Sequence, residues 1–162
     1  MKKLLGFSIF LVFVLIASLT AEAKVTLPAI FSDNMVLQQN TQVNVWGKAA
    51  PGEKVTVKAS WLDKAVTAKA AANGKWTVKL KTPKAITNQS VTVSGENEIT
   101  INNVLIGEVW LCTGQSNMEF PVSRHPDVKW NTGMLNEAEE LKDADYPEIR
   151  LFHVKQDRKS VV

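Results

Sequence analysis

The stretch NGKWTVKL, Asn73 to Leu80, decides the character of the first half of the chain. Its first two residues both tolerate a positive φ angle, so they are a strong signal for a tight turn between two strands. After this turn, Trp76, Val78 and Leu80 alternate with polar residues. An alternation with a period of two is typical of a strand that buries one face and exposes the other. The stretch therefore predicts a β-hairpin with one buried face.

The same alternation recurs through the region that ends near residue 103. The alternating runs, including the one above, are 43–46, 55–61, 76–80, 91–93 and 99–101. Further turn signals, Pro51-Gly52 and Ser94-Gly95, lie between the runs. Several short strands at this spacing predict an all-β, sandwich-like domain over residues 24–103.

The pattern changes after residue 103. Residues 104–106 and 109–112 are almost continuously apolar, which predicts a strand buried on both faces in a parallel sheet. Residues 134–142 place their apolar side chains on one face of a helix, and Ile149–Val154 has the pattern of a second strand. This order predicts the first β-α-β portion of an α/β domain over residues 104–162. Since two strands and one helix cannot cover both faces of a buried sheet, we expect this portion to be incomplete.

The first 23 residues have the pattern of a secretory signal peptide. Basic residues at Met1–Lys3 precede an apolar run, Leu4–Leu19, and Ala21–Ala23 has the small residues of a cleavage site. The run is shorter than the roughly 20 residues that span a membrane, so no stable membrane anchor is predicted. We expect cleavage before Lys24 and an exported, periplasmic or extracellular protein.

Composition excludes several other classes. Hydrophobic residues make up 45% and charged residues 22% of the 162 residues, which indicates a globular protein and not a disordered one. The formal net charge is +3 and the lysines form no block, so no nucleic-acid partner is predicted. Cys112 is the single cysteine, which excludes an intrachain disulfide and a cysteine-based zinc site. We expect a buried, inert thiol there, and neither a cofactor nor a metal site.

Ser116 is the candidate nucleophile. It follows the apolar segment 109–112 and Gly114, at the place where α/β hydrolases present a serine on a tight turn. Backbone N–H groups of such a turn can bind an oxyanion. The pattern is Gly-x-Ser-x-Met, however, whereas the usual nucleophile elbow is Gly-x-Ser-x-Gly. A turn serine that caps the following segment is the alternative.

Two blocks of the sequence resemble a known family. Gly107–Cys112 followed by Gly114–Met118 resembles the first catalytic block of the sialate O-acetylesterase family, which is of the SGNH type of carbohydrate esterases. Leu27–Gln39 and Val43–Val57 are similar to the β-rich N-terminal region of these enzymes. The resemblance implies hydrolysis of acetyl esters on sialic acid or related sugars, with Ser116 as nucleophile. Gly114, Gln115 and Asn117 would then bind substrate or assist the oxyanion, although amides also simply close turns.

The resemblance also implies a catalytic base in a sequence pattern that this chain does not contain. In this family an Asp-x-x-His arrangement supplies the partners of the serine. Three residues before His125 stands Val122, and three residues before His153 stands Arg150. We therefore expect the aspartate and histidine beyond residue 162. Because an unassisted serine is a poor nucleophile, the 162-residue chain alone is predicted to have negligible esterase activity.

Two function classes remain open. The first is an exported serine esterase of which this chain is the N-terminal portion. The second is a non-catalytic β-sandwich module that binds glycan or packs against a partner. Trp46, Trp61 and Trp76 are assigned to the apolar phase of their strands, which favours core packing over carbohydrate stacking. His125 is kept as a candidate for substrate contact.

Overall fold

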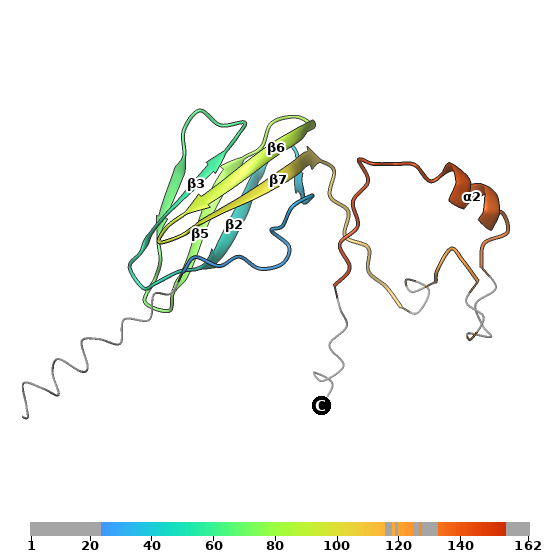
Figure 1. The fold of residues 1–162 in the computed structure, drawn as a ribbon, viewed down its shortest axis with the longest axis horizontal. Coiled ribbons are helices and arrows are strands. Elements are labelled where there is room, and N and C mark those ends of the chain that lie inside the picture. The colour runs from blue at the N-terminus through green and yellow to red at the C-terminus, as the bar shows by residue number, and fades with distance from the viewer. Residues whose placement is uncertain (1–23, 116–117, 119, 125–126, 128–132, 155–162) are drawn as a thin grey trace, which may run out of the picture.

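A computed structural model of the chain describes residues 24–115, 118, 120–124, 127 and 133–154. The predicted signal peptide, residues 1–23, lies outside the described residues. The described part is mostly β-structure with one short helix, as Figure 1 shows. Its elements are β1 (Val36–Gln38), β2 (Gln42–Lys48), β3 (Lys54–Ala59), β4 (Val66–Lys69), β5 (Lys75–Lys81), β6 (Ile86–Ser94), β7 (Glu98–Gly107) and α2 (Glu137–Asp143).

The strands form two sheets. One has five strands in the order β1-β7-β6-β3-β4, and the other consists of β2 and β5. Strand β1 runs parallel to β7, whereas the other pairs are antiparallel. Trp46 is opposite Thr77 in the smaller sheet, and Val57 is opposite Val93 in the larger one. Figure 1 shows the strands gathered in one body, with α2 in the chain that follows β7.

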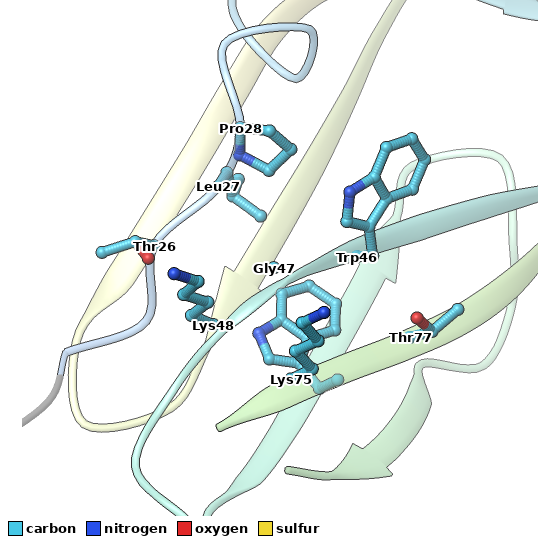
Figure 2. A pocket seen from close by; sticks show the side chains of 9 residues that line it. Thr26, Leu27, Pro28, Trp46, Gly47, Lys48, Lys75 and Thr77 are labelled. Carbon is cyan, nitrogen blue, oxygen red and sulfur yellow. The ribbon is translucent and has the colours of Figure 1, made fainter. Parts of the chain in front are cut away.

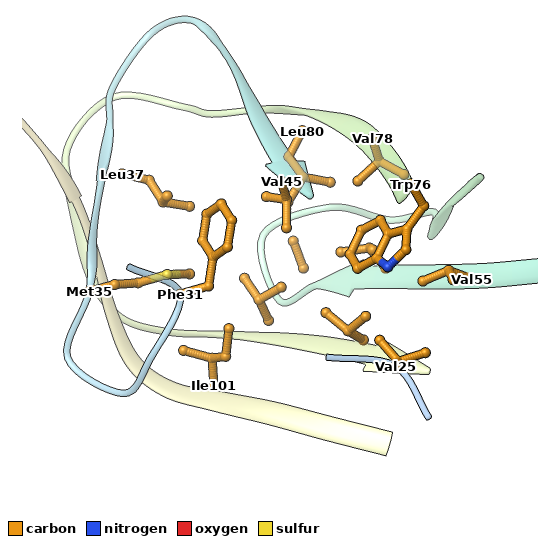
Figure 3. Close-up of a cluster of buried hydrophobic side chains, with 14 of the residues drawn as sticks. Val25, Phe31, Met35, Leu37, Val45, Val55, Trp76, Val78, Leu80 and Ile101 are labelled. Atoms are coloured by element: carbon orange, nitrogen blue, oxygen red, sulfur yellow. The ribbon is translucent and has the colours of Figure 1, made fainter. Parts of the chain in front are cut away.

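The alternation predicted from the sequence is confirmed in β2, β3, β5, β6 and β7, although the run 55–61 extends two residues beyond the end of β3 at Ala59. In β5 the burial alternates strictly, and Leu80 is completely buried. Buried side chains from both sheets belong to one hydrophobic cluster (Figure 3). Its fully buried members include Val45, Val55, Val57, Val91 and Val93. Since burying one such side chain contributes about 1.5–3 kcal/mol, this shared core holds the two sheets together.

The predicted hairpin at Asn73-Gly74 is wrong in one respect. The tight turn forms, with Gly74 at φ 75° and the Lys75 N–H donating to Asn73 Oδ1 over 3.0 Å. The strands on either side do not pair with each other, however, because β4 pairs with β3 and β5 pairs with β2. The turn thus carries the chain from one sheet to the other. Alternation predicts that a strand exists, but the choice of partner depends on contacts distant in sequence.

The apolar residues 104–106 form the end of β7. Val104, Leu105 and Ile106 are consecutively buried, and Leu105 pairs with Val36 of the parallel strand β1. Asn103, with a φ of 53°, precedes them, and the pairing of β6 with β7 is irregular here. A bulge of this kind shifts the inward phase of a strand, which explains three buried residues in a row. The expected domain boundary between 103 and 104 therefore falls inside β7.

The strands predicted at 109–112 and 149–154 do not form. Both segments are irregular, and Leu111 remains 89% exposed. Cys112 is exposed as well, so the prediction of a buried thiol is wrong. A continuous apolar strand depends on neighbouring strands to cover it, and none of the described strands pairs with these segments. The predicted helix forms, but it begins at Glu137 and buries no residue.

Within the described residues, no helix is both long and apolar enough to cross a membrane.

Candidate functional site

The segment that leaves β7 carries the site residues predicted from the sequence. Gly114 and Gln115 lie on it and are exposed, whereas Ser116 and Asn117 are outside the described residues. On the far side of these two, the Met118 N–H donates to the Gln115 carbonyl oxygen over 2.9 Å. A Cβ atom at position 114 would come within 2.8 Å of Met118 Cγ, so a larger residue would push against Met118. His125 also lies outside the described residues.

Glu108 anchors the start of this segment to the end of β1. Its carboxylate accepts hydrogen bonds from Gln39 Nε2 at 2.6 Å and Gln38 Nε2 at 3.1 Å. Gln38 Oε1 accepts in turn from the Val109 N–H at 2.8 Å, and the Gln39 N–H donates to the Gly107 carbonyl oxygen at 2.8 Å. The hydrogen bond from Gln39, and secondarily that from Gln38, lowers the pKa of Glu108 below its ordinary value of 4.5.

Sequence reasoning missed this anchor. Both halves lie within the blocks that carry the family resemblance, at 27–39 and 107–112. Their contact joins residues separated by 69 and 70 positions, which no local pattern reveals. Residues from the two blocks that carry the resemblance are thus hydrogen-bonded to each other. Their contact lies where the segment that carries Ser116 leaves the sheet.

Three further hydrogen bonds connect described residues after position 120 with one another and with the β-rich part of the chain. The Met134 N–H donates to the Val122 carbonyl oxygen over 2.9 Å, and the Arg124 N–H donates to Glu137 Oε2 over 3.3 Å. These bonds connect residues 122–124 with Met134 and with Glu137 at the start of α2. Farther along, Arg150 Nη1 donates to the carbonyl oxygen of Asn34 over 3.1 Å. His153 lies on the exposed segment that follows and contributes to none of these contacts.

No group of three or more histidine, cysteine, aspartate or glutamate side chains suited to a metal ion occurs in the described part of the chain.

The tryptophans divide between core and surface. Trp76 is buried as predicted, and Trp61 is partly buried, with its Nε1 donating to the Lys81 carbonyl oxygen over 2.9 Å. The core prediction is wrong for Trp46, which is 43% exposed. In β2 the inward positions are held by Val45 and Gly47, so Trp46 lies on the opposite face. It lines a surface cavity of about 450 Å³ (Figure 2).

Comparisons with known proteins identify relatives over most of the chain, although no protein-family model matches it. Sialate O-acetylesterase from Mus musculus is 30% identical over 138 residues, which cover 78% of this chain and 24% of the mouse protein. The Homo sapiens enzyme is 28% identical over 134 residues, 76% of this chain and 24% of its own length. The chain thus spans about a quarter of the length of these curated relatives.

A solved structure agrees with these relatives. A carbohydrate acetylesterase from Xanthomonas citri is 37% identical and superposes with a TM-score of 0.58, covering 61% of this chain and 22% of that protein. Sequence and structure comparisons therefore lead to the same group of carbohydrate esterases. These relatives and this structure support the assignment of the chain to the sialate O-acetylesterase family.

Proposed function

We propose that this chain is the nucleophile-bearing portion of an exported carbohydrate esterase, which removes acetyl groups from sialic acid or related sugars. Ser116 is the nucleophile of this reaction. The observation that carries the proposal is the Gly114-Gln115-Ser116-Asn117 segment in a member of this family, held at its start by Glu108. Export follows from the signal-peptide pattern of residues 1–23.

The reaction proceeds in two steps. Ser116 Oγ attacks the carbonyl carbon of the acetyl ester while a base takes its proton, and the resulting oxyanion is held by N–H groups around Gly114 and by the Asn117 side chain. Collapse of this intermediate breaks the bond between the acyl carbon and the sugar oxygen, which receives the proton from the base and leaves as a hydroxyl, and an acetyl-serine remains. Water then attacks the acetyl group, releasing acetate and restoring Ser116. Gln115 lies exposed beside the serine and would orient the sugar.

The aspartate and histidine that assist Ser116 lie, in this proposal, outside residues 1–162. Support comes from the two histidines of the chain, neither of which follows an aspartate by three positions, and from the quarter-length coverage of the relatives. Residues 24–107 form the sandwich-like unit of the enzyme, and the chain after Gly107 contributes to its SGNH-type domain. Further elements of that domain would cover Trp110, Leu111 and Leu151, which are large, apolar and exposed.

Release of acetate from O-acetylated sialic acid tests the proposal on the protein as its own cells produce it. Ser116→Ala is expected to lower kcat at least about 10⁴-fold, because covalent catalysis is lost. Ser32→Ala is the matched control, since Ser32 is an exposed loop serine far from this segment in sequence, and it should leave the rate unchanged. A Ser116→Ala enzyme that keeps its full rate would refute the assignment.

The 162-residue chain by itself provides a second test. General-base assistance is worth about 10²–10⁴-fold, so the isolated chain should hydrolyse an aryl acetate no faster than its Ser116→Ala variant. Turnover by the isolated chain that disappears in this variant would show that the base lies within residues 1–162.

A further inference from the structure

A second candidate site lies on the outward face of the smaller sheet. The cavity of about 450 Å³ is lined by Leu27 and Pro28 from the N-terminal segment, Trp46 and Lys48 from β2, and Lys75 and Thr77 from β5. Figure 2 shows Leu27, Pro28 and Trp46 above Gly47 in the view, and Lys48 and Lys75 below it. Ligand cavities in proteins commonly measure about 300–1,000 Å³, so this one can hold a small ligand.

Backbone pairing builds the walls of this cavity. The β2–β5 ladder places Trp46 opposite Thr77 and Lys48 opposite Lys75, all four on the exposed face. Next to β2, Thr26 and Lys48 exchange two backbone hydrogen bonds, of 2.8 and 3.0 Å. These bonds fix the wall formed by Leu27 and Pro28 alongside the strand. The cavity is therefore supported by regular main-chain pairing.

Trp46 presents a large aromatic surface to this cavity in a fixed orientation. Its ring contacts that of Phe31 in an edge-to-face arrangement, with the ring centroids 4.7 Å apart and an interplanar angle of 79°. Because Phe31 belongs to the buried core, its ring restrains the orientation of the Trp46 ring. An indole that is held in place yet 43% exposed can stack on the apolar face of a ligand without a large loss of side-chain entropy.

The two lysines of the cavity make it electropositive. Like charges directly opposite each other in a ladder are destabilising, and Lys48 and Lys75 form such a pair. Among the described residues, neither lysine has a carboxylate partner within ion-pair distance. The exposed positions of the two strands carry no acidic side chain at all; they are Gln42, Asn44, Trp46, Lys48, Lys75, Thr77, Lys79 and Lys81. An anionic group between Lys48 and Lys75 would relieve their repulsion.

We propose that this cavity binds a sugar residue that carries a carboxylate. The apolar face of the sugar ring stacks on Trp46, its carboxylate pairs with Lys48 and Lys75, and Thr77 offers a hydroxyl to its polar edge. The residues that line this cavity all lie between Thr26 and Thr77, so the proposed binding does not depend on the esterase activity. It would keep an acidic glycan bound to the protein, whichever bond the enzyme cleaves.

Titration calorimetry of the full chain with trigalacturonic acid, and with neutral galactotriose for comparison, tests the proposal. The acidic trisaccharide is expected to bind saturably at one site, at least about 10-fold more tightly than the neutral one, and more weakly as salt is raised. Equal binding of both sugars would overturn the role of the lysines. Absence of binding by trigalacturonic acid would overturn the site itself.

Charge reversals locate the site. Lys48→Glu and Lys75→Glu should each weaken binding of trigalacturonic acid, and the two combined should weaken it at least about 10-fold. Lys79→Glu is the matched control for each single reversal, because Lys79 is on the same face of β5 but does not line the cavity. It lies four residues from Lys75, about 13 Å along the strand, which exceeds the screening length of about 8 Å at physiological salt. An equal loss in Lys79→Glu would indicate diffuse electrostatic attraction and contradict the proposal.

The aromatic wall has its own test. Trp46→Ala should weaken binding about 10-fold, provided that thermal unfolding shows the variant to be folded. If the variant does not fold, the lysine variants decide the question, because their side chains are exposed and outside the core. Unchanged affinity in a folded Trp46→Ala protein would refute stacking on this ring. Self-association of the chain that buries Trp46 and blocks the sugar would assign the face to a second copy instead.

Discussion

Glu108 is the carboxylate that ties the start of the segment carrying Ser116 to the end of β1. Because hydrogen bonds from Gln39 and Gln38 lower its pKa, the carboxylate is stabilised in the folded protein relative to the unfolded chain. That contribution is fully present above the ordinary pKa of a glutamate and is lost as the pH falls through the lowered value. The link between β1 and the Ser116 segment should therefore weaken in acid and hold at neutral pH.

A substitution isolates this effect. Gln39→Ala removes the 2.6 Å donor, so the pKa of Glu108 should rise toward its ordinary value, as followed by NMR titration of the side-chain carboxyl carbon. Gln42→Ala is the control, since Gln42 is an exposed glutamine of β2 that does not contact Glu108. A Glu108 pKa that is the same in Gln39→Ala and in the unsubstituted chain would contradict the account.

Gly47 is a second residue at which a single added atom, a Cβ, should affect the stability of the fold. A Cβ there would overlap the Thr26 carbonyl oxygen and come within 2.9 Å of Trp76 Cζ2. Gly47→Ala is therefore expected to lower the free energy of unfolding by about 1–3 kcal/mol, as measured by urea denaturation. Gly107→Ala serves as the matched control, because a Cβ at that position meets nothing within 4 Å. Equal stability of the two variants would mean that the close approach at Gly47 is not constraining.

At the scale of the elements, the sequence predicted the strands whose side chains alternate but not their partners. The runs around Val57, Val78 and Val93 contain enough buried positions to be recognised locally. Strand β1, with three residues, and β4, with four, are too short to show a period. The predicted strands at 109–112 and 149–154 failed for the opposite reason: their apolar patterns are clear, but the described part of the chain offers no neighbour to cover them.

The candidate sites likewise include residues that a local motif indicates and contacts that no local motif indicates. Gly114 to Asn117 could be recognised from a motif, since the chemistry of a nucleophile is local in sequence. The contact of Glu108 with Gln39 and the cavity at Trp46 could not, because both depend on how distant strands meet. Trp46 was misassigned against its own run, because a period of two from Val43 and Val45 places Trp46 on the same outward face as Asn44.

A pair of leucines tests the assignment of buried and exposed elements. Leu80 in β5 is completely buried, so Leu80→Ala should lower the free energy of unfolding by about 2–5 kcal/mol in urea denaturation. Leu111→Ala removes the same atoms from a side chain that is 89% exposed and should change stability by no more than about 0.5 kcal/mol. A large loss in Leu111→Ala would show that segment 109–112 is packed in solution.

The whole molecule combines a packed β-unit with a following chain that is attached at a few points. Residues up to Gly107 share one core, whereas Trp110, Leu135 and Leu151 expose most of their side chains. Among the described residues, the attachments include the hydrogen bonds of Glu108, Val109 and Arg150 to the β-unit. Stability is therefore expected to be concentrated in the sheets.

Hydrogen exchange measures this distribution directly. Backbone amides in β5, β6 and the centre of β7 should exchange slowly, whereas those of 109–112 and 149–154 should exchange quickly, because they are exposed and lie outside the ladders. Mass spectrometry of peptic peptides resolves these segments. Comparable protection in β6 and in 109–112 would show that the two parts unfold as one unit.

The central claim is that Ser116 is a nucleophile, and covalent labelling tests it most directly. The protein from its own cells is treated with a fluorophosphonate, and fragmentation of the tryptic peptide Ala85–Arg124 locates the adduct. The account predicts an adduct on Ser116 that is absent from heat-denatured protein and from Ser116→Ala. An adduct on Ser90, Ser94 or Ser123, or no adduct on an enzyme that still releases acetate, would contradict it.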